Sequence, residues 1–319
     1  MSDDITKKDK NMKMGNKRRS KRKFKNNMEL LVLTLPAVIF YLIFMYTPMF
    51  GLVIAFKDYK APKGILGSAW CGLKNFEFFF GSQDAFRISR NTVGFALLFI
   101  AINLITGIVV ALLLYEVKSQ RALKFYQTTM LLPRFLSWVI VGFITYTLLS
   151  PSMGILNKII ELFGGEGVDW YTQIKAWPFI LVITNTWKVL GLNCIMYYAA
   201  LMGVDKALYE AASIDGANRF KQILHVSLPS VKPLAIVLTL LAFGNIFRGD
   251  FGLFYIIPRD IGLLYPVTDV IDTYVYRGLR TGSLSTTAAV GLFQSIVGFV
   301  MIMSMNAIVR KVEPDSALY

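Results

Sequence analysis

Amide side chains are the polar groups that recur inside the long apolar stretches of this sequence. They stand at five positions: Asn103, Asn185, Asn193, Asn245 and Gln294. An amide donates and accepts hydrogen bonds, so the chemistry it supports is recognition rather than bond cleavage. Polar groups at membrane depth usually face the interior of a helical bundle. A hydrogen bond between helices is the favoured interpretation of each amide alone, but as a set they could line a hydrated passage.

The residue sets of an enzyme or a metalloprotein are missing from the sequence. His225 is the only histidine, and Cys71 and Cys194 fall in different predicted environments. There are no paired carboxylates and no ligand spacing that would hold a metal. There is also no GxxxxGK[ST] loop to cradle nucleotide phosphates. We therefore expect no enzyme activity, no metal site, no disulfide and no cofactor bound by this chain.

Helices that cross a membrane must position the amides. Of the 319 residues, 55% are hydrophobic and only 17% are charged, whereas a soluble domain carries roughly 25% charged residues. Because open strands leave backbone groups unpaired in lipid, the expected fold class is all-α, a polytopic membrane protein. About six stretches reach the ~20 residues that a transmembrane helix needs: 30–53, 92–115, 125–149, 177–202, 231–251 and 284–309.

The positive charge of the chain is concentrated at its start. The net charge is +14, and eleven of the 34 Lys and Arg residues lie between Lys7 and Lys25. A basic segment before a hydrophobic span predicts a cytoplasmic tail, here 1–29, followed by a transmembrane domain, 30–319. An even number of spans then places both termini in the cytoplasm. We expect contact with membrane lipid and not with nucleic acid; binding of the tail to anionic lipid or to a partner stays an alternative.

The loop 205–229, between the fourth and fifth spans, has the pattern of two short helices joined by a turn. Asp205 is a suitable N-cap for a helix that runs to about Asp215, and alanines keep one face of this helix small. Gly216 permits the sharp backbone turn that ends it. A second short helix should follow, with Pro229 marking its end. The pair is predicted to form a stiff lever on the cytoplasmic face.

This loop resembles the signature of the permease subunits of bacterial ABC importers. The family pattern is Glu-Ala-Ala, three residues, Gly, nine residues, Ile, one residue, Leu-Pro, and here Val226 replaces the Ile. The resemblance implies the type I importer permease fold and makes the loop a coupling helix that docks on a separate ATPase subunit. The residues it assigns to this coupling are Glu210, Ala211, Ala212, Asp215, Gly216, Leu228 and Pro229.

The resemblance extends over 30–319 and favours the carbohydrate-uptake branch. Leu131-Leu132-Pro133, Trp187-Lys188 and the runs 247–255 and 268–277 are similar to the sub-branch that handles oligosaccharides. It implies import through a bacterial plasma membrane by alternating access. The implied partners are a homologous second permease, two ATPase subunits that hold ATP and Mg, and an extracellular substrate-binding lipoprotein.

Sugars are bound by hydrogen-bonding groups combined with flat aromatic faces. The residues that we rank highest for the sugar path are Trp187, Lys188, Tyr198, Asn245 and Arg248. A charge at mid-depth costs roughly 2.5–3.5 kcal/mol, so Lys188 should either pair structurally or line the path. An importer for a non-sugar solute stays open. An ion-coupled transporter is disfavoured, since no carboxylate lies deep in the second, third, fourth or sixth span.

Overall fold

The computed structural model describes residue 28 and residues 30–312, which form two compact units. The first unit ends at Ile54 and the second begins at Ala55. An apolar helical segment, Leu30–Phe56, is long enough to cross a membrane and accounts for the described part of the first unit. It contains a π-helical turn, Leu42–Tyr46, and a 3₁₀ stretch, Thr47–Phe56. The predicted tail 1–29 lies outside the described residues except for Met28.

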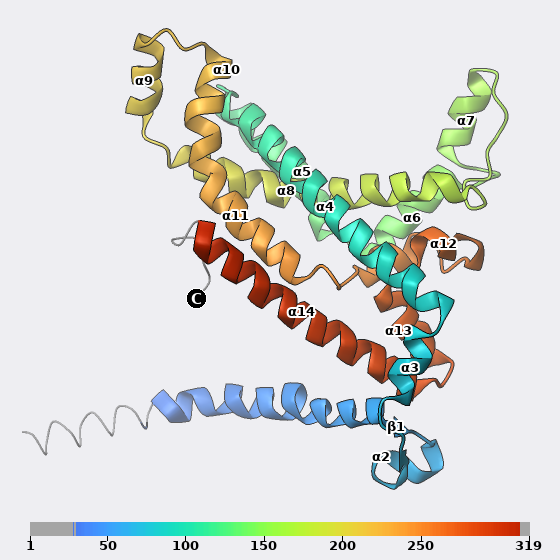
Figure 1. Cartoon of the computed structure of the whole chain (residues 1–319). Helices are drawn as coiled ribbons and strands as arrows, with labels where there is room; N and C mark the ends of the chain where they lie inside the picture. Colours follow the sequence, from blue (N-terminus) through green and yellow to red (C-terminus); the bar gives the residue numbers. More distant parts are fainter. Residues whose placement is uncertain (1–27, 29, 313–319) are drawn as a thin grey trace, which may run out of the picture. The chain divides into compact units, whose positions relative to one another are not determined.

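Four long helices dominate the second unit (Figure 1). They are α4 (Gln83–Tyr115), α8 (Trp177–Met202), α11 (Leu228–Gly244) and α14 (Leu284–Val312). The most extensive packing joins α4 to α8, and α11 lies against α14. Each lies in a helical segment that is long and apolar enough to span a bilayer. The expected all-α polytopic fold is confirmed, because helices satisfy the backbone hydrogen bonds that lipid cannot.

The predicted third span, 125–149, is divided into two helices. It consists of α5 (Gln120–Phe135) and α6 (Trp138–Leu149), which meet at an angle of 100°. The backbone of Leu136 is extended at the break, and the Ser137 side chain caps α6 by accepting the Ile140 N–H. Pro133, inside the last turn of α5, removes a backbone donor just before this elbow.

The predicted fifth span, 231–251, also needs correction at both ends. The helical segment begins at α10 (Arg219–Gln222), continues through a π-helical turn, Ile223–Ser227, and ends with α11 at Gly244. Pro229 therefore does not end a helix. It lies in the first turn of α11, where its missing N–H is tolerated, and the π turn before it absorbs the local irregularity.

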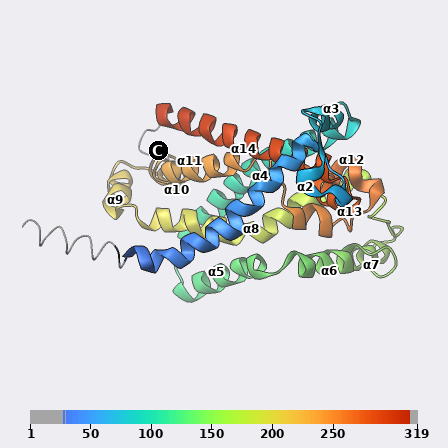
Figure 2. The ribbon, with the colours of Figure 1, turned by 90° about the horizontal axis from the view of Figure 1, so that it is seen from below.

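The short elements gather at opposite ends of the long helices (Figures 1 and 2). One end carries α9 (Lys206–Ile214) and α10. The other carries α3 (Lys74–Phe80), α7 (Ile155–Leu162), α12 (Tyr265–Thr268) and α13 (Ile271–Arg280). The remaining elements are one-turn helices and a two-stranded antiparallel hairpin: β1 (Lys57–Asp58), Ala61–Lys63, α2 (Gly64–Gly67), β2 (Ala69–Trp70), Ile174–Ala176, Gly252–Ile256 and Gly262–Leu264.

Helices α5 and α8 touch through their backbones at one position, where there is no room for a side chain. A Cβ on Gly191 of α8 would lie 2.0 Å from the carbonyl oxygen of Met130 in α5. The glycine is therefore required by the backbone contact. Beyond the elbow, α6 packs instead against α7 and the turn Gly252–Ile256, so the two halves of the broken span have different neighbours.

Candidate transport site

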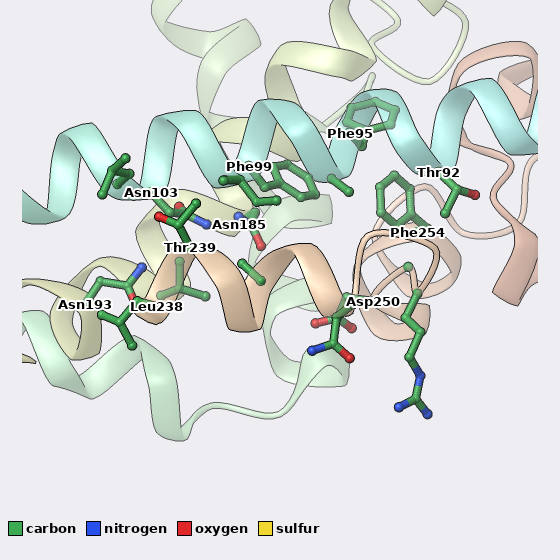
Figure 3. Close-up of a pocket in the computed structure, with 18 of the residues that line it drawn as sticks. Thr92, Phe95, Phe99, Asn103, Asn185, Asn193, Leu238, Thr239, Asp250 and Phe254 are labelled. Carbon is green, nitrogen blue, oxygen red and sulfur yellow. The ribbon is translucent and has the colours of Figure 1, made fainter. Parts of the chain in front are cut away.

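A cavity of about 360 Å³ opens between α4, α8, α11 and the segment that follows α11. This volume lies within the range of about 300–1,000 Å³ that is typical of small-molecule sites. Phe95, Phe99 and Phe254 form an aromatic wall, with the Phe95 and Phe254 rings 5.0 Å apart (Figure 3). The polar residues that line the cavity are Thr92, Asn103, Asn185, Asn193, Thr239, Asn245, Arg248 and Asp250.

Two of the lining amides have buried atoms without a hydrogen-bond partner. Asn103 Oδ1 and Asn185 Nδ2 make no hydrogen bond to any part of the chain that the structure describes. Asn185 is only 7% exposed, and both side chains lie in the space between α4 and α11 in Figure 3. A buried polar group left unpaired costs about 1–3 kcal/mol. The wall is thus equipped to hydrogen-bond a polar molecule inside the cavity.

Of the five amides singled out in the sequence, some line the cavity and one forms a hydrogen bond between elements. Four of them, Asn103, Asn185, Asn193 and Asn245, line the cavity. Gln294 does not: its Nε2 donates to the Phe247 carbonyl at 2.6 Å and to Asp272 Oδ2 at 3.2 Å. That is the hydrogen bond between elements that the sequence favoured for each amide taken alone.

The residues ranked highest for the sugar path divide in the same way. Asn245 and Arg248 line the cavity, beyond the C-terminal end of α11. Trp187 is largely exposed on α8, and Tyr198 packs into apolar clusters near Tyr197 and Cys194. Neither of them lines this cavity, and their part in a sugar path stays a prediction.

Lys188 is buried at the elbow rather than in the cavity. It is 5% exposed, and its Nζ donates to the carbonyl of Pro133 at 3.3 Å and to that of Leu136. The ammonium also lies 4.9 Å from the ring centre of Trp138, a cation–π distance. Lys188 therefore satisfies the carbonyls that the break exposes, which is the structural pairing expected as one of its two roles.

A second polar region, which we call the Asp269 cluster, lies at the α13 end and was missed in the sequence. Asp269 is fully buried and accepts from Arg87 Nη2 at 3.2 Å, from Arg277 Nη2 at 2.5 Å and from Thr273 Oγ1 at 2.7 Å. Arg277 also pairs with Asp260 at 3.3 Å. Among the described residues, no group of acidic, histidine or cysteine side chains is arranged to hold a metal.

The coupling loop has the predicted local structure up to its turn. Asp205 caps α9 by accepting the Ala207 N–H at 2.9 Å. Gly216 ends the turn with φ +76°, a conformation that favours glycine. Glu210 is exposed on α9. The other residues assigned to coupling are exposed or half-buried: Ala211, Ala212, Asp215, Leu228 and Pro229.

Contacts that the sequence did not predict fix α9 to the bundle. The Tyr209 hydroxyl lies 2.9 Å from Ser227 Oγ, in the π turn before α11. The Tyr209 ring stacks on Tyr115, the last residue of α4, with centroids 5.8 Å apart. Gln222 Nε2 donates to Ser213 Oγ at 2.8 Å. Helix α9 is therefore in contact with α4 and with the turn that leads into α11, and both of these helices line the cavity.

The chain matches a known family over most of this bundle. Residues 107–314 match the model of the family described as the binding-protein-dependent transport system inner membrane component. The chain belongs to this family. The match begins inside α4 and includes the elbow, the coupling loop and the cavity walls formed by α8 and α11. The α4 residues that line the cavity, between Thr92 and Leu104, precede the matched region.

Similar proteins of known name include permeases for polysaccharides. The permease is 38% identical over 283 residues to the polygalacturonan/rhamnogalacturonan transport system permease protein YteP of Bacillus subtilis (strain 168), with 88% of each chain covered. A crystal structure of a bacterial ABC transporter for import of the acidic polysaccharide alginate matches with a TM-score of 0.84 and 33% identity. It covers 92% of the permease and 99% of that chain.

A second structure of the alginate transporter includes its binding protein. It contains alginate pentasaccharide bound to the periplasmic protein and matches with a TM-score of 0.83 and 33% identity, covering 91% of the permease and 97% of that chain. Together these findings confirm the resemblance to permease subunits of bacterial ABC sugar importers and the type I fold. The permease is accordingly a transport component that spans a membrane several times.

Proposed function

We propose that the permease moves oligosaccharides into the cytoplasm through the cavity between α4, α8 and α11. The observation that carries this proposal is the pair of unpartnered amide atoms, Asn103 Oδ1 and Asn185 Nδ2, on the cavity wall. Sugar hydroxyls donate and accept hydrogen bonds, and they suit both atoms. The names of the similar proteins, which concern polygalacturonan and alginate, support this class of cargo.

Transport is coupled to ATP hydrolysis on separate subunits. The permease binds no cofactor, and ATP and Mg reside on two ATPase subunits that dock on α9 around Glu210, Ala211 and Gly216. Closure of the ATPases moves α9, and the contacts of Tyr209 with Tyr115 and Ser227 carry this motion to α4 and α11. The walls of the cavity then alternate between outward and inward access.

We assign the remaining partners to the two ends of the helical bundle. A homologous second permease completes the pathway, and a substrate-binding lipoprotein delivers cargo at the end that carries α12 and α13. The α9 end lies in the cytoplasm together with both termini, in a bacterial plasma membrane. The family description, which makes transport dependent on a binding protein, supports the receptor as a partner.

The lever role of the loop is tested by replacing Gly216 with proline. Proline fixes φ near −65°, which is incompatible with the φ of +76° at this turn. We expect G216P to insert and assemble but to lose ATP-driven oligosaccharide uptake in proteoliposomes that contain all partner subunits. Stimulation of the ATPase by the loaded receptor should be lost as well.

The matched control is G164P, since Gly164 has nearly the same φ, +79°, in the turn after α7 at the opposite end. This variant should keep receptor-stimulated ATP hydrolysis. Normal uptake by G216P would contradict the lever role. Wild-type proteoliposomes that carry no oligosaccharide, although the ATPase runs, would contradict the sugar cargo.

A further inference from the structure

The guanidinium of Arg248 is the cationic group that lines the cavity. It forms no hydrogen bond or ion pair with any residue in the described part of the chain. The half-buried arginines of the Asp269 cluster are different, since Arg87 and Arg277 both bind carboxylates. Arg248 is an exposed residue of the cavity lining, and its five N–H donors are used by no other part of the described chain.

Two carboxylates near Arg248, those of Asp250 and Asp272, accept hydrogen bonds from other groups. Asp250 Oδ1 accepts the backbone N–H groups of Gly252 and Leu253 at 3.0 and 3.4 Å. Asp272 Oδ2 accepts the Gly249 N–H and the Gln294 amide. Burial raises the pKa of the Asp272 carboxyl above its ordinary value, although these hydrogen bonds and Arg248 act in the opposite direction. Neither carboxylate neutralises Arg248 by direct contact.

When the cavity closes around cargo, the Arg248 guanidinium needs a negatively charged partner. When water leaves a site, the effective dielectric constant falls and an unpaired charge becomes costly. A neutral sugar would leave the guanidinium uncompensated. A carboxylate on a sugar ring would accept two parallel N–H donors from it, the geometry in which arginine binds carboxylates most strongly. The amides of the cavity wall would meanwhile bind hydroxyl groups.

We infer that Arg248 selects acidic oligosaccharides by binding a carboxylate of a uronic acid ring inside the cavity. This inference rests on the proposed sugar pathway and adds the charge of its cargo. Arg248 is a specificity-determining residue in this assignment, whereas Asn103 and Asn185 contact any sugar. The cavity would admit a neutral oligosaccharide less well than an acidic one of the same length.

The test compares trigalacturonate with its fully methyl-esterified form, which has nearly the same shape but no charge. Both probes are given to the complete importer in proteoliposomes with saturating receptor, and kcat/KM of uptake is measured for each. A hydrogen-bonded charge is worth a factor of about 10 to 100. We therefore expect R248Q to lower the acid-to-ester ratio by that factor and R248K to restore part of it. R134Q, which removes an exposed arginine outside the cavity lining, should keep the ratio.

To separate the preference of the permease from that of the receptor, the same ratio is also measured as direct binding to the receptor-free complex in detergent. An unchanged ratio in R248Q, or an equal loss for both probes, would overturn the inference. A wild-type importer that carries a neutral oligosaccharide but not trigalacturonate would overturn it too, while leaving the sugar pathway intact. Failure to carry any oligosaccharide would instead refute the proposed function.

Discussion

The Asp269 cluster and the cavity both place polar side chains between packed helices, but they differ in how their polar groups are paired. The Asp269 carboxylate has its partners, although Arg87 Nε in the same cluster has none. Asp269 receives two arginines and a threonine hydroxyl, whereas Asn103, Asn185 and Arg248 keep hydrogen-bonding capacity unused. Saturated buried groups hold elements in one arrangement, because breaking any contact leaves a charge behind. Unsaturated groups beside a cavity hold little together and remain able to bind cargo. The contrast separates the residues that hold the bundle together from those that we propose to contact cargo.

The largest effect is expected from D269A. The substitution leaves Arg87 and Arg277 without their shared carboxylate, and breaking a buried pair costs about 3–5 kcal/mol. The thermal midpoint of the purified permease complex should fall steeply. The control is D58A, since the Asp58–Lys60 pair is exposed and such pairs are worth about 0–1 kcal/mol. If D269A and D58A had equal midpoints, the Asp269 cluster would stabilise the protein no more than an exposed ion pair does.

An intermediate effect is expected from K188M. Methionine fills a similar volume but leaves the carbonyls of Pro133 and Leu136 without their donor, at a cost of about 1–3 kcal/mol. Thermal unfolding measures the loss, and K158M, at an exposed lysine on α7, serves as the control. If K188M unfolds at the wild-type temperature, Lys188 does not hold the elbow.

The smallest effect on stability is expected from N185L. Asn185 Nδ2 has no hydrogen-bond partner within residues 30–312, so an apolar residue of similar shape should change stability by less than about 1 kcal/mol. Uptake of oligosaccharide should nevertheless fall, because the cargo loses a hydrogen bond. Thermal unfolding and uptake are measured on the same preparation. A destabilised variant with normal uptake would reverse the assignment of Asn185 from transport to structure.

Local features of the site could be predicted from the sequence. The cap at Asp205 and the turn at Gly216 depend on neighbouring residues, so residue type and spacing were sufficient to place them. The cavity amides could be predicted as a set, because a polar group in an apolar span has few acceptable positions. Gln294 shows the limit of that argument, since the same residue type satisfies a helix contact instead.

Long-range partners could not be predicted. Lys188 binds carbonyls 52 and 55 residues away, and Arg87 reaches Asp269 across 182 residues. The sequence indicated only that Lys188 needed a partner. The elbow had a local signal in Pro133, but the full 100° bend depends on the packing of α8, which no local pattern encodes. The stack of Tyr209 on Tyr115 depends in the same way on where two distant helices end.

The seam at Gly191 has a consequence for water as well as for side chains. A site where a methyl group would lie 2.0 Å from the Met130 oxygen also has no room for a water molecule. Water therefore cannot lie between the backbones of α5 and α8 at this point of contact.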